Sequence, residues 1–181
     1  MSSGEFEKLR PEVIEQATGV VLEIGVGAGH NLPLYKDISK IFALEPSQEL
    51  LAMAKERVVV PVEFLNTGAE HIPLPDHSVD TVVSTWTLCS VGNPEAVLRE
   101  IKRVLRTDGK FIFVDHGESP FFWIRFIQIT VTPITKHFTG NCHLERNIEG
   151  LLKGAGFQVK KMDHPQERFK PLIYNYQGVA V

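Results

Sequence analysis

Three closely spaced glycines follow a short apolar run near the start of the chain. Val20 to Ile24 is β-branched and aliphatic, which predicts a strand buried on both faces of a sheet. Gly25, Gly27 and Gly29 come directly after it. Glycines at this spacing let a chain leave a strand through a sharp turn and expose backbone N–H groups to a ligand that no Cβ keeps away. The stretch therefore predicts a ligand-binding loop.

Two carboxylates lie at positions that suit this loop. Glu23 interrupts the apolar run, so it lies at the exposed end of the strand or is paired, because burial of a lone carboxylate is very costly. Glu45 ends the next apolar run, Ile41 to Leu44, twenty positions after Gly25. In a doubly wound fold, a carboxylate at that distance accepts hydrogen bonds from ribose hydroxyls. The loop and Glu45 together predict a cofactor that contains a ribose.

Polar residues follow three more predicted strands. Because the carboxyl ends of parallel strands meet at one edge of a sheet, we expect these residues to gather where such sheets bind ligands. The imidazole of His116 titrates near neutral pH, so it is the candidate general base at this edge. The strands and the residues after them are Val62 to Leu65 with Gly68, Ala69 and Glu70, Asp80 to Ser84 with Thr85, and Lys110 to Val114 with His116.

Helical patterns separate these strands and predict the architecture. Five alternations of strand and helix favour a right-handed, mostly parallel sheet with helices on both faces. Ser47 caps the helix over 48–57, and Leu50, Leu51 and Ala54 are expected to face the core from it. The other predicted helices are 5–17, 31–35, 95–105, which a turn at Asp108 and Gly109 ends, and 145–155. Two further strand patterns, 157–162 and 174–181, bring the predicted number of strands to seven.

Length and composition fit one globular domain over residues 1–181. Hydrophobic residues make up 43% and charged residues 23% of the chain, which argues against disorder. The formal net charge of -3 is not the balance of a protein that wraps nucleic acid. We therefore expect a globular domain that begins with a helix in residues 1–19 and has no nucleic-acid partner.

Two cysteines and one apolar segment bear on metal binding and on the compartment. Cys89 and Cys142 lack Cys-x-x-Cys spacing, so the sequence suggests neither a disulfide framework nor a zinc site, and we expect no metal. The apolar run 121–134 contains Arg125 and is shorter than the ~20 residues that a spanning helix needs. The polar N-terminus lacks the apolar core of a signal peptide. We expect a cytoplasmic protein with no integral membrane segment.

The glycine spacing separates two classes of cofactor. Nicotinamide and flavin enzymes favour Gly-x-Gly-x-x-Gly, whereas the third glycine here comes one residue early. Glu23-x-Gly25-x-Gly27-x-Gly29 resembles motif I of the class I S-adenosylmethionine-dependent methyltransferases. The sequence also lacks a Tyr-x-x-x-Lys pair, which disfavours a nicotinamide-dependent oxidoreductase.

The resemblance extends over nearly the whole chain. Ser78-Val79-Asp80 and the stretch from Glu100 to Gly109 resemble the ubiquinone/menaquinone biosynthesis methyltransferases. Leu88-Cys89-Ser90-Val91, Asp115-His116 and the stretch from Gly140 to Arg146 resemble the small methyltransferase-like family whose animal members methylate thiols. Those relatives carry a hydrophobic N-terminal membrane segment that this sequence lacks, so membrane residence is not expected. The implied fold is a doubly wound, seven-stranded Rossmann-like α/β sheet, mostly parallel, with a C-terminal antiparallel hairpin.

The resemblance implies a role for each residue at the predicted edge. The three glycines admit the methionine part of S-adenosylmethionine, and Glu23 helps to hold its amino group. Glu45 accepts hydrogen bonds from both ribose hydroxyls, which suits an anionic acceptor facing two neutral donors. The adenine lies between Pro46 and Ala69. The implied cofactor-binding set is Glu23, Gly25, Gly27, Gly29, Glu45, Pro46, Gly68, Ala69, Glu70 and Thr85.

Methyl transfer from a sulfonium is an in-line displacement, so the protein mainly aligns and desolvates the reactants. His116 is the implied base for an acceptor that arrives protonated. The aromatic-rich segment 121–138, within 117–143, is expected to cover a small apolar acceptor such as a thiol, a hydroxyl compound or a quinol. Core packing and a homodimer surface are the alternatives for this segment. The sequence thus predicts a methyltransferase, and a non-catalytic S-adenosylmethionine-binding module is the alternative.

Overall fold

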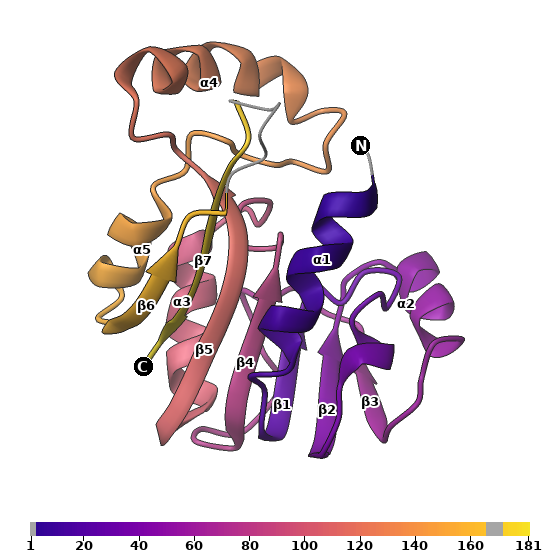
Figure 1. Ribbon diagram of the computed structural model, residues 1–181. Coiled ribbons are helices and arrows are strands. Elements are labelled where there is room, and N and C mark those ends of the chain that lie inside the picture. Colours follow the sequence, from indigo (N-terminus) through magenta and orange to yellow (C-terminus); the bar gives the residue numbers. More distant parts are fainter. Residues whose placement is uncertain (1–2, 166–171) are drawn as a thin grey trace.

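One seven-stranded sheet forms the centre of the structure (Figure 1). The computed structural model describes residues 3–165 and 172–181. The strands are β1 Gly19–Ile24, β2 Ile38–Leu44, β3 Val62–Leu65, β4 Val79–Thr85, β5 Leu105–Gly117, β6 Val159–Asp163 and β7 Tyr174–Ala180. They lie in the order β3-β2-β1-β4-β5-β7-β6, with β1 to β5 parallel and β7 antiparallel to both β5 and β6. The predicted α/β sheet with its antiparallel C-terminal pair is confirmed.

Helices cover both faces of this sheet, as the alternation of patterns predicted. On one face, Val13 of the first helix and Leu51 of the second pack against buried β1 and β4 residues. On the other face, the third and fifth helices pack against the aromatic side chains of β5. The helices are α1 Ser3–Ile14, the 3-10 helix η1 Leu32–Leu34, α2 Gln48–Lys55, α3 Pro94–Val104, α4 Phe122–Thr135 and α5 Ile148–Gly154.

The helix α3 ends at Val104, within one residue of the predicted end, but the turn predicted at Asp108 and Gly109 lies inside a strand. The strand β5 begins at Leu105, directly after α3, and therefore contains both of these residues. Its pairing with β4 shifts register between Val79 and Thr81, so β5 carries extra residues as an irregularity at this end. The turn-forming residues thus mark a distortion of the strand rather than the end of the helix.

The helix α2 has the predicted cap and a narrower buried face than expected. The Ser47 hydroxyl accepts a hydrogen bond from the Leu50 N–H. Leu51 and Ala54 are buried, as expected, but Leu50 is 37% exposed. The prediction for Leu50 was wrong because this side chain borders a cavity at the edge of the sheet rather than the core.

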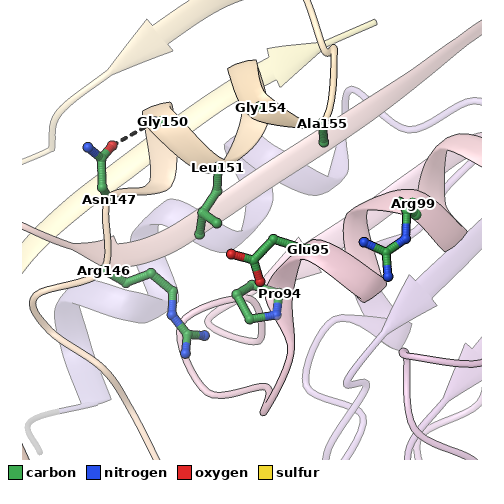
Figure 2. Close-up of a pocket in the computed structure, with 9 residues that line it drawn as sticks. All are labelled: Pro94, Glu95, Arg99, Arg146, Asn147, Gly150, Leu151, Gly154 and Ala155. Carbon is green, nitrogen blue, oxygen red and sulfur yellow. Dashed lines mark hydrogen bonds between the residues drawn. The ribbon is translucent and has the colours of Figure 1, made fainter.

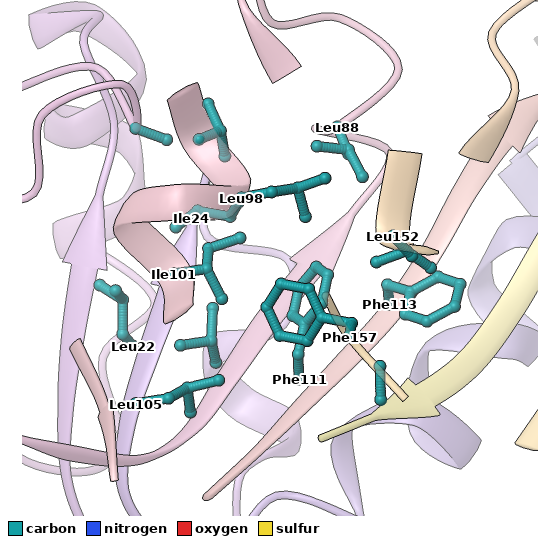
Figure 3. Close-up of a cluster of buried hydrophobic side chains, with 14 of the residues drawn as sticks. Leu22, Ile24, Leu88, Leu98, Ile101, Leu105, Phe111, Phe113, Leu152 and Phe157 are labelled. Carbon is teal, nitrogen blue, oxygen red and sulfur yellow. The ribbon is translucent and has the colours of Figure 1, made fainter. Parts of the chain in front are cut away.

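Aromatic side chains of β5 form the centre of the larger apolar cluster (Figure 3). Phe111 and Phe113 are fully buried, and the Phe111 ring lies 5.5 Å from that of Phe113 and 5.7 Å from that of Phe157. Leu98 and Ile101 of α3 pack on the same cluster. Burial of these large side chains fixes α3 against β5, and this contact holds the carboxyl end of the sheet in place.

The helix α4 lies beyond the carboxyl ends of the parallel strands, at the top of Figure 1, and its polarity is inverted. Its buried residues are Gln128 and Thr132, whereas most of its aromatic and aliphatic side chains are exposed. Gln128 accepts from the Ser119 N–H and donates to the carbonyls of Gly117 and Leu172. Core packing is therefore the wrong interpretation of the aromatic segment. Within the described residues, no helix has the length and apolar character needed to cross a membrane.

We expect Phe111→Ala to lower the free energy of unfolding by about 3–5 kcal/mol, because it leaves a cavity in the close-packed core. Phe138→Ala removes the same atoms from a side chain that is 85% exposed, and it should change stability by no more than about 0.5 kcal/mol. Urea denaturation of both variants beside the parent protein measures the difference. Equal losses in the two variants contradict this placement of the core.

Candidate active site

A cavity of about 540 Å³ opens at the carboxyl ends of β1, β2 and β4. Seven of the ten predicted cofactor-binding residues line this cavity. They lie together because the loops at the carboxyl ends of parallel strands meet at one edge of the sheet. Those seven are Gly25, Glu45, Pro46, Gly68, Ala69, Glu70 and Thr85, and the other lining residues are Leu44, Leu50, Trp86, Thr87, Ser90, Val91, Gly92, Thr139 and Gly140. The predicted residues Glu23, Gly27 and Gly29 lie beside the cavity rather than on its wall.

The three glycines of the loop all have positive φ, but the space around the backbone differs from one glycine to the next. A Cβ at Gly25 would lie 2.3 Å from the Thr87 hydroxyl. A Cβ at Gly29 would lie 2.8 Å from the backbone of Ala54, so this glycine lets α2 approach the loop. A Cβ at Gly27 would meet only the Gly25 carbonyl oxygen, at 4.0 Å. Gly27 is therefore the least crowded of the three glycine positions.

The carboxylate of Glu45 holds the glycine loop against the start of α2. Its Oε2 accepts from the Gly27 N–H at 3.1 Å, and its Oε1 accepts from the Ser47 N–H at 3.0 Å. Each carboxylate oxygen can accept a second hydrogen bond. Glu45 is nearly buried yet lines the cavity, so both oxygens are fixed in position for a pair of hydroxyls. This geometry fits the ribose of the predicted cofactor.

Glu23 is buried and paired, which resolves the choice left open by its place in an apolar strand. Its Oε1 accepts from Asn31 Nδ2 at 2.7 Å, and its Oε2 accepts from the Tyr35 hydroxyl at 2.9 Å. Burial raises the pKa of Glu23 to about 7, although hydrogen bonds from Tyr35 and Asn31 and the charge of Arg10 oppose the shift. Asn31 Nδ2 also donates to Thr85 Oγ1 at 2.9 Å. Glu23 thus reaches the cavity wall through Asn31 and Thr85.

An ion pair on α3 holds the loop that carries Gly68, Ala69 and Glu70. Arg103 donates to both carboxylate oxygens of Glu100 and to the carbonyls of Ile72 and Leu74. The hydrogen bonds from Arg103 lower the pKa of Glu100 to about 2. Glu100 in turn accepts from the Ile72 N–H at 2.8 Å. The Glu-x-x-Arg motif of the sequence therefore holds the loop where the sequence predicted the adenine.

Trp86 is the main lining residue that sequence reasoning missed. It follows β4 with a φ of 53°, a left-handed conformation that is uncommon for a residue with a bulky side chain. Its Nε1 donates to Asn175 Oδ1 at 3.2 Å, and the Arg10 guanidinium lies 4.9 Å from its ring centroid. The position of Trp86 directly after β4 could have indicated that it belongs to the site. The residue types around it gave no sign of its left-handed backbone conformation.

His116 lies within β5, paired opposite Asn175 of β7, and not in a loop. Its side chain is 6% exposed and is not part of the cavity wall. Its Nδ1 lies 3.2 Å from Cys142 Sγ and 3.8 Å from Cys89 Sγ. A hydrogen bond with Cys142 and burial raise the pKa of the Cys89 thiol well above its usual value. The structure therefore brings the candidate base to two cysteines that are distant in sequence.

A second cavity, of about 700 Å³, lies between α3 and α5 and contains none of the predicted site residues (Figure 2). Arg146 points from its wall toward the segment after β4 and donates to the carbonyls of Leu88 and Val91. This side chain fixes the segment that carries Cys89 and Ser90. We therefore place the cofactor in the smaller cavity, where the glycine loop and Glu45 lie, and assign Arg146 a supporting role.

Known proteins resemble the chain in sequence and in fold. The family model described as a methyltransferase domain matches residues 22–113. Thiol S-methyltransferase TMT1A from Homo sapiens is 32% identical over 168 residues, which cover 86% of this chain and 69% of that protein. Phosphatidylethanolamine N-methyltransferase from Cereibacter sphaeroides is 39% identical over 103 residues, 54% of this chain and 51% of that protein. A Bacillus halodurans structure assigned as a methyltransferase has a TM-score of 0.75 at 16% identity, over 98% of this chain and 96% of that one.

We expect Glu45→Ala to weaken binding of S-adenosylmethionine and of S-adenosylhomocysteine by about 1–3 kcal/mol each, because the two predicted hydrogen bonds from the ribose hydroxyls are lost. Titration calorimetry measures both affinities. Glu63→Ala is the matched control, since Glu63 pairs with Lys40 on the exposed side of β3. An affinity of Glu45→Ala equal to that of the parent contradicts the role of this carboxylate.

We expect the stability of the ligand-free protein to fall as the pH rises from 4.5 to about 7, because the native Glu23 carboxyl keeps a proton that the unfolded chain releases. The stabilisation is complete below pH 4.5 and is lost above about pH 7, with a size on the order of 3 kcal/mol. Glu23→Gln should remove the part of the pH dependence that comes from Glu23. Urea denaturation between pH 4.5 and 8 measures the free energy of unfolding of parent and variant. An equal slope of this free energy against pH in the two proteins contradicts the prediction.

Proposed function

Because the chain belongs to the class I S-adenosylmethionine-dependent methyltransferases, we propose that its methyl acceptor is a small, apolar thiol. The observation that carries this proposal is that Glu45 and Glu70, which the proposal assigns to the ribose and the adenine, are the only ionisable residues among the described residues that line the cavity. Trp86, Thr87, Ser90, Val91 and Thr139 form the neutral part of its wall. A wall without charge favours a neutral acceptor over a charged amine or an acid.

The other part of the cavity fits S-adenosylmethionine. The surroundings of Gly27 are the least crowded of the loop, and the Glu45 carboxylate is held by the N–H groups of Gly27 and Ser47 while it lines the cavity. The sulfonium of the bound cofactor supplies the electrophilic methyl group. The chain contributes orientation, since the loop after β1 and the segment after β4 face the same cavity.

Similarity favours sulfur over nitrogen as the methylated atom. The alignment with the thiol S-methyltransferase covers 86% of this chain, whereas that with the phosphatidylethanolamine N-methyltransferase covers 54%. Thr139 and Gly140 line the cavity, follow α4 and lie beyond the matched methyltransferase domain model, and we infer that they contribute to acceptor binding. A relative that aligns over most of the chain is therefore the better guide to the acceptor.

A thiol acceptor must lose its proton before or during transfer. The sequence suggested His116 as the base, but no histidine is among the described residues that line the cavity. His116 remains the candidate base near the cavity. Its imidazole contacts the thiols of Cys89 and Cys142, and these contacts bear on whether it can accept a proton. Cytoplasmic location, self-association and the lack of a nucleic-acid partner stay predictions from the sequence.

We expect the protein to methylate small apolar thiols at least tenfold faster than the matched alcohols, amines, phenols and quinols, because the cavity wall is neutral and the thiolate is the strongest nucleophile of the set. A labelled-methyl assay over thiol and alcohol pairs with the same carbon skeleton measures this ratio. Glu45→Ala is the control that links product to cofactor binding. Faster methyl transfer to an amine or a quinol contradicts the proposal of a thiol acceptor. Binding of the cofactor without formation of any methylated product favours a non-catalytic module.

A further inference from the structure

We propose that Cys89, His116 and Cys142 form a Zn²⁺ site, and that its fourth ligand is the thiol of the acceptor. The three side chains come from three separate parts of the fold: the segment after β4, the strand β5 and the turn after α4. Their ligand atoms lie within 4.8 Å of one another. The metal site stands on this geometry alone, whereas its role toward the acceptor rests on the proposed thiol methyltransferase function.

The triangle of ligand atoms has the size of a zinc coordination shell. Cys89 Sγ and Cys142 Sγ are 3.6 Å apart, and His116 Nδ1 lies 3.2 Å from Cys142 Sγ and 3.8 Å from Cys89 Sγ. A tetrahedral ion with bonds of about 2.3 Å to sulfur and 2.0–2.1 Å to nitrogen separates its ligand atoms by about 3.5–3.8 Å. Shifts of a few tenths of an ångström therefore give coordination distances without rearrangement of the backbone.

Hydrogen bonds hold in place the two segments that carry Cys89 and Cys142. The Cys89 N–H donates to Asp115 Oδ1 at 3.1 Å, which ties the segment after β4 to β5. The Cys89 carbonyl accepts from the His143 N–H at 2.9 Å, and Asn141 Nδ2 donates to the Ser90 carbonyl at 2.8 Å. These contacts tie the turn that carries Cys142 to the same segment. A site whose ligands are already oriented binds a metal without a large cost in conformational entropy.

The donor set selects the ion. Two thiolates and one imidazole suit a borderline-soft ion such as Zn²⁺, whereas Mg²⁺ and Ca²⁺ prefer oxygen ligands. Two thiolates also balance the charge of a divalent cation. Cys89 and Cys142 are almost fully buried, and a centre without net charge is the kind that can be buried at little cost.

Three protein ligands and one open position are typical of catalytic zinc sites, whereas structural sites have four protein ligands. The cluster lies directly behind the neutral part of the cavity. Cys89 Sγ is 3.6 Å from Ser90 Oγ, and the His116 ring is 6.4 Å from that of Trp86. Both Ser90 and Trp86 line the cavity. In this proposal the acceptor sulfur reaches the fourth position from the cavity, past the Ser90 side chain.

The reaction then balances without a protein base. Zn²⁺ binds the acceptor thiol, whose proton passes to solvent, because a coordinating thiol is deprotonated outright. The bound sulfur uses a lone pair to form a bond to the methyl carbon of S-adenosylmethionine. The bond from that carbon to the sulfonium sulfur breaks, and its electron pair stays on the sulfur of S-adenosylhomocysteine. The thioether product is neutral, binds zinc weakly and leaves. His116 thus holds the metal and does not accept the proton.

Metal binding is tested on the full chain, freed of metal under a non-thiol reductant and titrated with Co²⁺ and Zn²⁺. We expect one equivalent of each ion, and a thiolate-to-cobalt charge-transfer absorption in the near ultraviolet that Zn²⁺ abolishes. Cys89→Ser and Cys142→Ser should each weaken binding by more than about 100-fold, since loss of outer partners alone costs about 10–100-fold. His143→Ala is the control and should bind normally, because that imidazole pairs with Glu145 outside the cluster.

The parent protein provides a readout that does not depend on variant folding. Zn²⁺ should protect both cysteines from alkylation, and its removal should expose them to the reagent under partly denaturing conditions. No charge-transfer absorption in the parent overturns the site. So does binding that survives in both cysteine variants, or a Cys89–Cys142 disulfide as the only reaction of the two thiols.

The acceptor role is tested with S-adenosylhomocysteine bound, so that no turnover occurs. A small apolar thiol should change the Co²⁺ spectrum, and the alcohol with the same skeleton should not. Metal-free protein that methylates the thiol at an unchanged rate overturns this inference and leaves the proposed function standing. Thiol ligation to the metal with no methylated thiol in any assay supports the metal site and contradicts the proposed function instead.

Discussion

The Glu45 carboxylate is the interaction on which the rest of the site depends. It joins the glycine loop after β1 to the start of α2 through the N–H groups of Gly27 and Ser47. Gly29 lets α2 come close enough for this contact, because Ala54 occupies the space of a side chain there. The buried Glu45 carboxylate thus sets the distance between two loops of the parallel sheet. The cofactor site is a consequence of that spacing.

A second constraint concerns the end of the sheet where we propose that the acceptor binds. The helix α4 is anchored by polar contacts of Gln128, and most of its apolar side chains are exposed. The turn that follows it returns to the cavity with Thr139 and Gly140 and brings Cys142 to Cys89. Polar anchoring of this helix therefore couples this part of the cavity wall to the cluster of Cys89, His116 and Cys142.

Features that depend on local pattern could be predicted from the sequence, including the strand after Gly19, the Ser47 cap and the distance from Gly25 to Glu45. The inverted polarity of α4 could not, because an aromatic-rich helical pattern ordinarily marks a core. The turn at Trp86 has no signature in residue type. The cluster of Cys89, His116 and Cys142 has no spacing signature either, since three separate segments supply its ligands. Only the folded chain brings them within bonding reach.

We propose that this methyltransferase transfers its methyl group to a sulfur atom. A single acceptor that carries both a thiol and a hydroxyl on one small aromatic ring tests this proposal without comparison between molecules. The protein is incubated with this acceptor and S-adenosylmethionine that carries a deuterated methyl group, and mass spectrometry locates the label. We expect a labelled thioether with a free hydroxyl. A label on oxygen or on a ring carbon contradicts the proposed acceptor.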